Sequence, residues 1–222
     1  MKRQSSTRRR GFTLIELLTV ITIIAMLAAL GFVAMQFAIN KGREKDTISL
    51  ITTVSAALKS YRDDNGNYPR PANAEQTTVV KEETWVVGGA AMLYQVLSGD
   101  GTTAIRNGEK LPTGEQASAK DDKIPFSGKI YMDSIIAPTK KQREEKKQAK
   151  NVEADGEESF YVCDPWRHPL RYQVPDRDRN GVVTDDIKMH SDSDFELWSY
   201  GELKKPEDTD EAQLKWIGNW GR

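Results

Sequence analysis

The sequence predicts an α+β protein in which one long N-terminal helix packs, by its second half, against a small antiparallel β-sheet. Three observations predict this fold. An almost unbroken apolar run covers residues 12–38, apolar residues recur at helical spacing up to residue 61, and strand-like segments follow residue 158. At 222 residues the chain has room for one ordinary domain plus extras, so a large multidomain enzyme is excluded.

The charge balance excludes a general nucleic-acid-binding protein. Lysine and arginine number 32 against 33 aspartates and glutamates, so there is no overall basic field. A single cysteine, Cys163, excludes an intrachain disulfide and a cysteine-based zinc site. Positive charge is concentrated in a leader, residues 1–11, which contains Lys2, Arg3, Arg8, Arg9 and Arg10.

Residues 12–38 form a predicted membrane-spanning and assembly helix, with Glu16 as its one charged side chain. A helix of this length measures about 40 Å, against about 30 Å for the hydrocarbon core of a bilayer. Threonines inside the run can return their hydroxyls to the helix backbone. The basic leader favours a leader-inside, body-outside orientation, which in a bacterium puts the body in the periplasm.

Three other kinds of N-terminal segment are weaker alternatives. A secretory signal has a shorter apolar region, and the alanines here never fall in Ala-x-Ala spacing. A twin-arginine export signal is disfavoured by Glu16. A plain signal anchor without further processing stays open. Glu16 either has a partner and a role in the apolar run or reaches back to the nearby lipid headgroups.

The residues around Glu16 resemble the processing site of type IV prepilins and of type II secretion pseudopilins. The sequence over 10–18 is Arg-Gly-Phe-Thr-Leu-Ile-Glu-Leu-Leu. The resemblance implies that a prepilin peptidase cuts between Gly11 and Phe12 and methylates the new amino terminus. In low dielectric an unpaired charge of either sign is costly, so Glu16 would pair with the Phe12 amine of a neighbouring subunit and set the register between subunits.

Residues 39–65 are predicted to continue the same helix in amphipathic form. One apolar face is formed by Ile48, Ile51, Val54, Leu58 and Tyr61. The helix is expected to stop at residues 63–67, where Gly66 can take a left-handed cap. The tetrapeptide over 66–69, Gly-Asn-Tyr-Pro, resembles the one that closes this helix in pseudopilins.

Residues 66–222 form the predicted globular head. Its expected elements are a short helix over 89–97, an exposed loop over 102–123, a short strand over 129–132 and strands over 159–162 and 194–201. The last strand alternates Phe195, Leu197 and Ser199 with Glu196, Trp198 and Tyr200, which predicts one buried face. The charged run over 140–158 is expected to be a partly helical, mobile surface segment.

The C-terminal motifs, in their order along the chain, resemble the C-terminal half of the major pseudopilin. They are Asp-Pro-Trp-x-x-Pro from Asp164, a strand, Ser-x-Gly from Ser199, an acidic loop, and Gly-Asn-Trp from Gly218. Together with the N-terminus, the resemblance covers residues 8–69 and 160–220. It implies a type IV pilin-like fold.

Calcium is a predicted ligand of one of two loops. The first fits the first half of an EF-hand loop, with a glycine at position 6, but position 12 is Ile187. Its candidate ligands are Asp176, Asp178, Asn180, Val182, Asp185 and Asp186. The alternative interpretation is a polar hairpin tip.

The second calcium candidate is the loop over 202–215, which binds calcium in major pseudopilins. Asp208 and Asp210 are its best candidate ligands. The chain departs from the family here, because Glu202-Leu203-Lys204 replaces the usual Ala-Asp-Gly. A solvated run of charges is the alternative interpretation.

No catalytic site is predicted, and the chain is not expected to be an enzyme. His190, Ser191 and Asp192 are neighbours in sequence, which points their side chains in different directions. Cys163 is expected to pack as a small apolar residue and His168 to be a surface or hinge residue. The five tryptophans are expected to serve packing rather than glycan binding.

The predicted function is that of a structural subunit of a periplasmic pseudopilus in a type II protein secretion system, polymerising through its N-terminal helix. The resemblance implies as partners other copies of the chain, minor pseudopilins, the prepilin peptidase and an inner-membrane assembly platform. It places the chain in the bacterial inner membrane as a single-pass protein with a periplasmic C-terminal domain. The alternatives are a type IV pilus subunit and a membrane-anchored periplasmic protein that binds calcium or a glycan.

Overall fold

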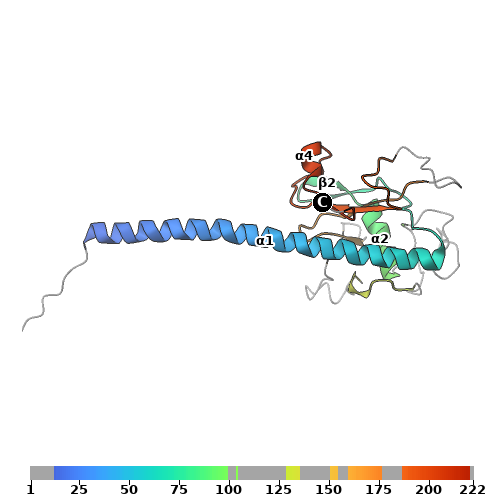
Figure 1. Cartoon of the computed structure of the whole chain (residues 1–222), viewed down its shortest axis with the longest axis horizontal. Coiled ribbons are helices and arrows are strands. Elements are labelled where there is room, and N and C mark those ends of the chain that lie inside the picture. Colours follow the sequence, from blue (N-terminus) through green and yellow to red (C-terminus); the bar gives the residue numbers. More distant parts are fainter. Residues whose placement is uncertain are drawn as a thin grey trace, which may run out of the picture. The chain divides into compact units, whose positions relative to one another are not determined.

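The computed structural model describes residues 13–99, 104, 129–135, 151–154, 160–176 and 187–220. Two compact units divide between Gly42 and Arg43, and each is described by itself (Figure 1). The elements are α1 (Leu14–Asn65), β1 (Thr77–Val80), β2 (Glu83–Val86), α2 (Gly88–Ser98), η1 (Asp133–Ile135), β3 (Val152–Ala154), β4 (Phe160–Val162), β5 (Arg171–Gln173), β6 (Glu196–Ser199), α4 (Asp210–Gln213) and β7 (Ile217–Gly218). The predicted α+β architecture is confirmed.

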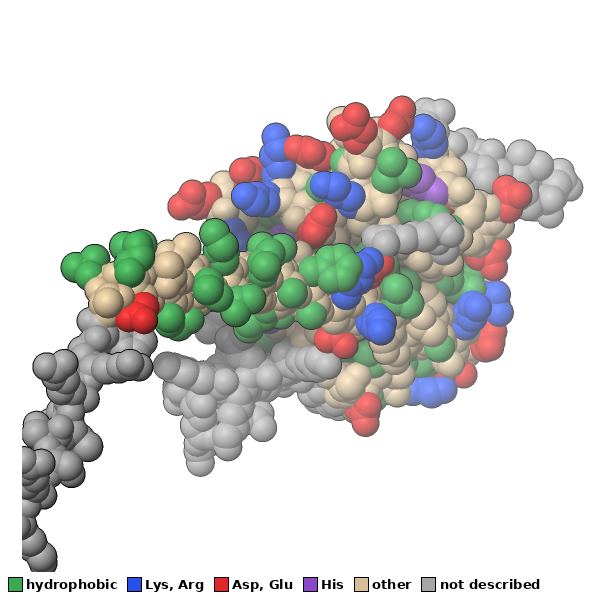
Figure 2. Space-filling view, turned by 60° about the vertical axis from the view of Figure 1, so that its left-hand side comes forward, with side chains coloured by type: hydrophobic (Ala, Val, Ile, Leu, Met, Phe, Trp, Pro, Cys, Tyr) green, Lys and Arg blue, Asp and Glu red, His purple; other side chains and the backbone are tan. Residues whose placement is uncertain are grey.

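Helix α1 is the predicted single helix, with 52 residues. In the unit before Arg43 its large apolar side chains are exposed, from Leu14 (82%) to Phe37 (66%), as the hydrophobic surface in Figure 2 shows. By length and composition, α1 is the one described helix that is apolar enough to cross a membrane. It ends as predicted, because Gly66 adopts a φ of 82° and its N–H donates to the Arg62 carbonyl at 2.6 Å.

The second half of α1 supplies one wall of the head's main core. Ile51, Val54, Leu58 and Tyr61 are buried, as the apolar spacing predicts. Ile48 is the exception in the predicted face, since its side chain stays 49% exposed. Its position near the start of the amphipathic segment leaves it outside the packed core cluster.

Helix α2, predicted over 89–97, is nearly all buried and packs on β4 and β5. It begins with two glycines that the packing requires. A Cβ on Gly88 would lie 1.8 Å from the Asn73 carbonyl oxygen, and one on Gly89 would lie 3.2 Å from the Tyr172 side chain. The helix ends at Gly99, which has a φ of 72°.

The strands form three small antiparallel sheets, not one. β1 pairs with β2, β3 pairs with β4, and β5, β6 and β7 form a three-stranded sheet with β6 in the middle. The β1–β2 hairpin turns through Lys81 and Glu82, both at positive φ. The bridge between Cys163 and Pro169 closes the loop that leads from β4 to β5.

The prediction of a strand over 129–132 is wrong, and the prediction of a partly helical surface segment over 140–158 is wrong for residues 152–154. Residues 129–132 do not form a strand, because the backbone N–H groups of Tyr131 and Met132 both donate to the Leu97 carbonyl at the end of α2. A 3₁₀ turn, η1, follows and buries Ile135. Within the charged run over 140–158, residues 152–154 form strand β3, because Val152 is buried in the core; residues 140–150 and 155–158 lie outside the described residues.

Strand β6 was predicted to have one buried face, and this is also wrong, since all four of its residues are buried. Phe195 and Leu197 face the main core. On the other face, Trp198 and Tyr200 join Trp85 and Trp216 in a second, aromatic cluster. A second layer of side chains therefore covers the face that the sequence pattern assigns to solvent.

Candidate assembly and binding sites

The start of α1 is closed by a reciprocal pair of hydrogen bonds between Thr13 and Glu16. One oxygen of Glu16, Oε2, accepts from the Thr13 backbone N–H at 2.9 Å and from its hydroxyl at 2.7 Å. The Glu16 N–H donates back to the Thr13 hydroxyl oxygen at 3.3 Å. This is a capping box, in which a threonine and a glutamate three residues later satisfy each other's free backbone donors.

The role of Thr13 was missed by the sequence reasoning, although the signal was present. The spacing Thr-x-x-Glu directly before an apolar run marks a helix N-terminus. Farther along, the Thr19 hydroxyl donates to the Glu16 carbonyl at 2.9 Å and the Thr22 hydroxyl to the Leu18 carbonyl at 2.8 Å, as predicted for threonines in the apolar run.

The predicted processing site, Gly11 and Phe12, lies outside the described residues. Cleavage there and pairing of Glu16 with an amine of another subunit stay predictions. In the described chain, one oxygen of the Glu16 carboxylate, Oε2, accepts both hydrogen bonds from Thr13.

In the head, Asp164 organises the Asp-Pro-Trp-x-x-Pro loop from a buried position. Its Oδ1 accepts from the backbone N–H groups of Trp166 and His168 at 2.8 and 2.9 Å, and its Oδ2 accepts from the Ser199 hydroxyl at 2.5 Å. Burial raises the pKa of Asp164 to about 6, although these three hydrogen bonds act in the opposite direction. The Ser199 oxygen also accepts from the Gly201 N–H at 2.8 Å. The Ser199 hydroxyl therefore connects the Ser-x-Gly motif to the Asp164 loop.

His168 was predicted to be a surface or hinge residue, and the surface position is wrong, because it is only 3% exposed. Its ring stacks on Trp85 of β2 at 4.2 Å between centroids. Burial, helped by the nearby Lys81 charge, lowers the pKa of His168 to about 4. The Lys81 ammonium also donates to the Trp166 carbonyl at 2.7 Å, so the β1–β2 hairpin is fixed to this loop at two points.

A second buried carboxylate, Glu196 of β6, has no exposed surface. Its Oε1 accepts from the backbone N–H groups of His190 and, at 2.9 Å, Ser191. Its Oε2 lies 2.9 Å from Nδ1 of His190 and accepts from the Gln173 amide at 2.8 Å. No sequence pattern marks this site, because Glu196 falls at a position that the strand alternation assigns to solvent.

The Gly-Asn-Trp ending has a physical reason at each position. The Asn219 side chain behaves like a further strand, with Oδ1 accepting from Leu197 N–H at 3.1 Å and Nδ2 donating to Phe195 carbonyl at 3.0 Å. Trp220 stacks on His190 at 4.7 Å between centroids. Gly218 must be glycine, because a Cβ there would lie 2.6 Å from the Trp220 ring.

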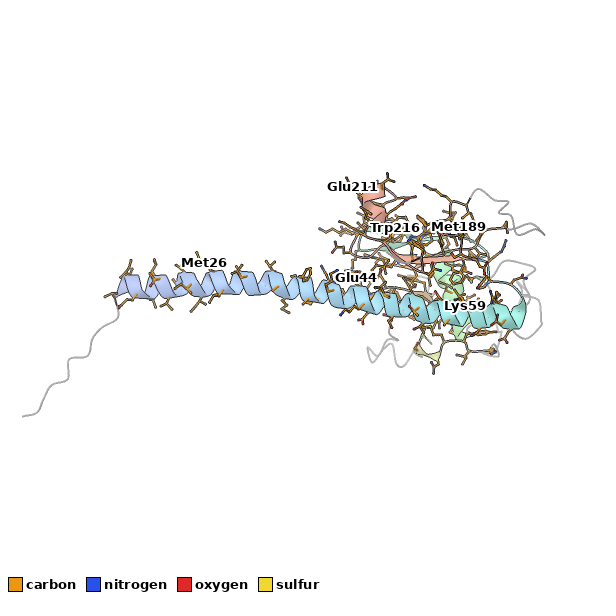
Figure 3. All side chains as sticks on the ribbon, viewed as in Figure 1. Met26, Glu44, Lys59, Met189, Glu211 and Trp216 are labelled. Carbon is orange, nitrogen blue, oxygen red and sulfur yellow. The ribbon has the colours of Figure 1, made fainter. Side chains whose placement is uncertain are left out.

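All five tryptophans serve packing, as predicted, and the two half-buried ones, Trp166 and Trp220, pack against the main core and the aromatic cluster. Trp85, Trp198 and Trp216 are at most 5% exposed, and Trp198 stacks on Trp216 at 5.7 Å between centroids. Figure 3 shows Trp216 within the head, below Glu211 of α4. Trp166 and Trp220 are half-buried.

The first calcium loop falls largely outside the described residues. Of its candidate ligands only Asp176 is described, and its carboxylate forms an ion pair with the Arg70 guanidinium. Asp178, Asn180, Val182, Asp185 and Asp186 are outside. A calcium ion at Asp176 would therefore compete with a positive side chain.

The second loop is described throughout, and part of it is helical. Thr209 caps α4, and its hydroxyl accepts from the Ala212 N–H at 3.2 Å. Asp210 is the first residue of α4, and Asp208 accepts from the Gln213 amide at 2.6 Å. Among the described residues no three His, Cys, Asp or Glu side chains gather closely enough to hold a metal, so this conformation does not assemble a calcium cage. Calcium stays a prediction.

The residues with catalytic potential are engaged elsewhere. Cys163 is fully buried, as predicted, and burial raises the pKa of its thiol to about 12. The Ser191 hydroxyl donates to the Ser193 hydroxyl at 2.9 Å, while His190 contacts Glu196, so these neighbours do not form a nucleophile–base pair.

Comparison with known proteins supports the N-terminal resemblance. The family model for the prokaryotic N-terminal methylation motif matches residues 6–32. The type II secretion system core protein G of Pectobacterium carotovorum subsp. carotovorum is 35% identical over 78 residues, 35% of this chain and 50% of that protein. The protein of the same name in Klebsiella michiganensis is 35% identical over 81 residues, 36% of this chain and 55% of that protein.

A fimbrial protein, EcpC of Eikenella corrodens, is 27% identical over 120 residues, which are 54% of this chain and 74% of that protein. The chain spans about half the length of the core G proteins above. No solved structure gives a significant match. The predicted resemblance is confirmed: the chain carries the prokaryotic, prepilin-type N-terminal methylation motif on an apolar helix of membrane-spanning length and is similar to type II secretion core protein G.

Proposed function

We propose that the chain is a structural subunit of a periplasmic pseudopilus in a type II protein secretion system. The observation that carries the proposal is the match of the N-terminal methylation motif to the start of a helix whose large apolar side chains, from Leu14 to Phe37, are exposed in the single chain. An apolar surface of this extent needs a cover, first the bilayer and then the helices of other subunits. The role is structural and not catalytic, in keeping with the burial of Cys163 and the pairing of His190 with Glu196.

In this proposal the chain crosses the bacterial inner membrane once, with the head in the periplasm. The basic leader would hold residues 1–11 on the cytoplasmic side. A prepilin peptidase would cut between Gly11 and Phe12 and methylate the new amine. The minor pseudopilins and the inner-membrane assembly platform would then receive the processed subunit.

Glu16 would change partners during this process. In the single chain its carboxylate accepts two hydrogen bonds from Thr13, which keeps it satisfied in an apolar surrounding. In the filament the Phe12 amine of a neighbouring subunit would offer a stronger, charge-assisted partner. The pairing would fix the axial register of one subunit against the next.

The proposal is tested by the intact mass of the protein from its native membranes, with sequencing of the N-terminal peptide. We expect a chain that starts at N-methylated Phe12 and filaments that can be sheared from cells. Glu16→Ala should still be cleaved but should reduce filaments by at least tenfold, whereas Thr19→Val, one turn away on the same helix, should leave them unchanged. A chain that keeps residues 1–11 in cells with an active peptidase would contradict the proposal and favour a membrane-anchored calcium- or glycan-binding protein.

A type IV pilus subunit is the second candidate, favoured by the similarity to a fimbrial protein over 74% of that protein's length. The two functions differ in where filaments form and in what fails without them. A deletion strain that loses secretion of exoproteins but keeps its surface fibres supports the pseudopilus. Loss of surface fibres with secretion intact supports the pilus.

We further propose that calcium stabilises one of the two acidic loops. At a calcium concentration ten times the dissociation constant, binding adds about 1.4 kcal/mol of stability, which raises the Tm by a few degrees. A chelator should reverse this shift. The double variant Asp208→Ala, Asp210→Ala abolishes the shift if the C-terminal loop binds calcium, and Asp178→Ala abolishes it if the first loop does; no shift in the parent protein contradicts both.

A further inference from the structure

A groove of about 690 Å³ runs along the head between α1 and the C-terminal segments. One wall is a stripe of α1 that runs from Ile48 to Lys59. Lys59 is labelled on the helix in Figure 3. The other wall is formed by residues 192–195 together with Gly218 and Asn219. All of these residues belong to the second compact unit.

The helical wall has the surface that a second helix packs against. Its lining residues follow the i, i+4, i+7, i+8 spacing of one helix face: Ile48, Thr52, Ser55 and Ala56. The middle of the stripe carries small side chains, which allow close approach of another backbone. Ile48 remains 49% exposed, so this apolar side chain is left to be covered by another molecule.

The opposite wall is acidic at the far end of the stripe. Asp192 and Asp194 line the groove, and Asp194 lies 3.5 Å from Arg62, which is also paired with Asp63 at 3.0 Å. With Lys59 included, the carboxylates still outnumber the basic groups at this end. An occupant that is apolar at one end and basic at the other would match the groove.

The chain itself contains such a helix, just before the groove-forming segment. Phe37 is 66% exposed, and Lys45, eight residues later, lies on the same helix face and is exposed. Eight residues span about 12 Å of helix, roughly the distance along the stripe from Ile51 to Lys59. A parallel helix from a second copy would therefore bring Phe37 to the apolar part and Lys45 to the acidic part.

We propose that this groove receives residues 34–45 of α1 from a second copy of the chain, with Phe37 against the small-residue stripe and Lys45 facing Asp192 and Asp194. The inference rests on the proposed function, since it names the contact between successive subunits. Pairing residue 37 with residue 51 and residue 45 with residue 59 implies an axial offset of about 20 Å between the two helices.

The test uses the full-length chain in native membranes, with Cys163 replaced by Ser so that introduced cysteines are unique. Phe37→Cys is combined with Thr52→Cys, which lies in the groove, or with Thr53→Cys, which is the next residue and lies outside it. Within one chain, residues 37 and 52 are about 22 Å apart on the helix, too far for a disulfide, so every cross-link joins two copies. We expect cross-linked ladders with Thr52→Cys and at least tenfold less product with Thr53→Cys.

Charge exchange provides an independent readout. Asp192→Lys with Asp194→Lys should lower cross-linking at least tenfold, and adding Lys45→Glu to the same chain should restore most of it. Sheared filaments with equal cross-linking at the two threonine positions would overturn the groove contact while leaving the proposed function intact. Unprocessed protein without filaments would overturn the proposed function. In that case cross-linking still tests the groove contact: product specific to Thr52→Cys supports the contact, and the absence of such product overturns it.

Discussion

Replacing Glu196 by alanine should cost the head more stability than any other single carboxylate substitution among the described residues. The side chain has no exposed surface, and its two oxygens accept from His190, Ser191 and Gln173. Two of these donors are backbone N–H groups, of His190 and Ser191. Alanine would leave these partly buried N–H groups without their acceptor, beside an imidazole and an amide that lose their partner as well.

The expected size of the effect follows from these contacts. Each buried donor or acceptor left without a partner costs about 1–3 kcal/mol, and Glu196→Ala unmakes several hydrogen bonds at once, so we expect a loss of about 3–5 kcal/mol. Glu196→Gln should cost only about 1–2 kcal/mol. Its carbonyl oxygen can keep the two backbone donors, and its NH₂ group would face the Gln173 amide and His190 Nδ1. Both of these can turn into acceptors, one by an amide flip and the other by a change of tautomer.

The measurement is urea unfolding of the full-length protein in detergent, followed by tryptophan fluorescence of the head. With an m-value of about 2 kcal/mol/M, Glu196→Ala should lower the midpoint by about 1.5–2.5 M and Glu196→Gln by less than about 1 M. Glu202→Ala is the matched control, because Glu202 is exposed and its ion pair with Lys215 is long, at 4.0 Å; its midpoint should barely move. Equal midpoints for Glu196→Ala and Glu202→Ala would refute the reasoning.

Two further changes test the packing of the head. Asn219→Ala removes both amide contacts to β6 and leaves the buried Leu197 N–H unpaired, so we expect a loss of about 2 kcal/mol by the same urea assay; a loss below 0.5 kcal/mol would contradict the strand-like role. Because the pKa of His168 is lowered, the unfolded chain is protonated at this residue between about pH 6.5 and pH 4, whereas the folded chain is not. The free energy of unfolding therefore falls as the pH falls through this window. His168→Phe keeps a ring against Trp85, and between pH 7 and 4.5 its free energy of unfolding should fall by about 2 kcal/mol less than that of the parent protein. The raised pKa of Asp164 acts in the opposite direction in both proteins. Parallel pH profiles of the two proteins would refute the assignment.

The long helix could be predicted because its signals are local. An apolar run long enough to span a bilayer, helical spacing over 48–61 and a glycine free to take positive φ at 66 act within a few residues of one another. The same holds for α2, whose ends are marked by Gly88 and Gly99. The capping box at Thr13 was equally local and should have been found from its spacing.

Residues 129–132 and 152–154 show where local reasoning fails. Residues 129–132 have a strand-like composition, but the nearest acceptor for their N–H groups is the end of α2. Residues 152–154 lie in a charged run, but Val152 is buried against the core, and β4 supplies their hydrogen-bond partners. Short segments follow the partner that the rest of the fold brings to them, because a few residues of propensity weigh less than burial and pairing.

By itself, the sequence determined that the protein has an apolar helix of membrane-spanning length, an amphipathic continuation and a small α+β head with pseudopilin-like motifs. These features depend on composition and on contacts between residues close in the chain. Only the tertiary structure decided that both faces of β6 are covered, that His168 is buried on Trp85 and that Glu196 is a buried carboxylate whose two oxygens both accept hydrogen bonds. Each of these depends on residues far apart in sequence, since a second layer of aromatic side chains must fold over the sheet before the polar groups beneath it lose their water and need partners.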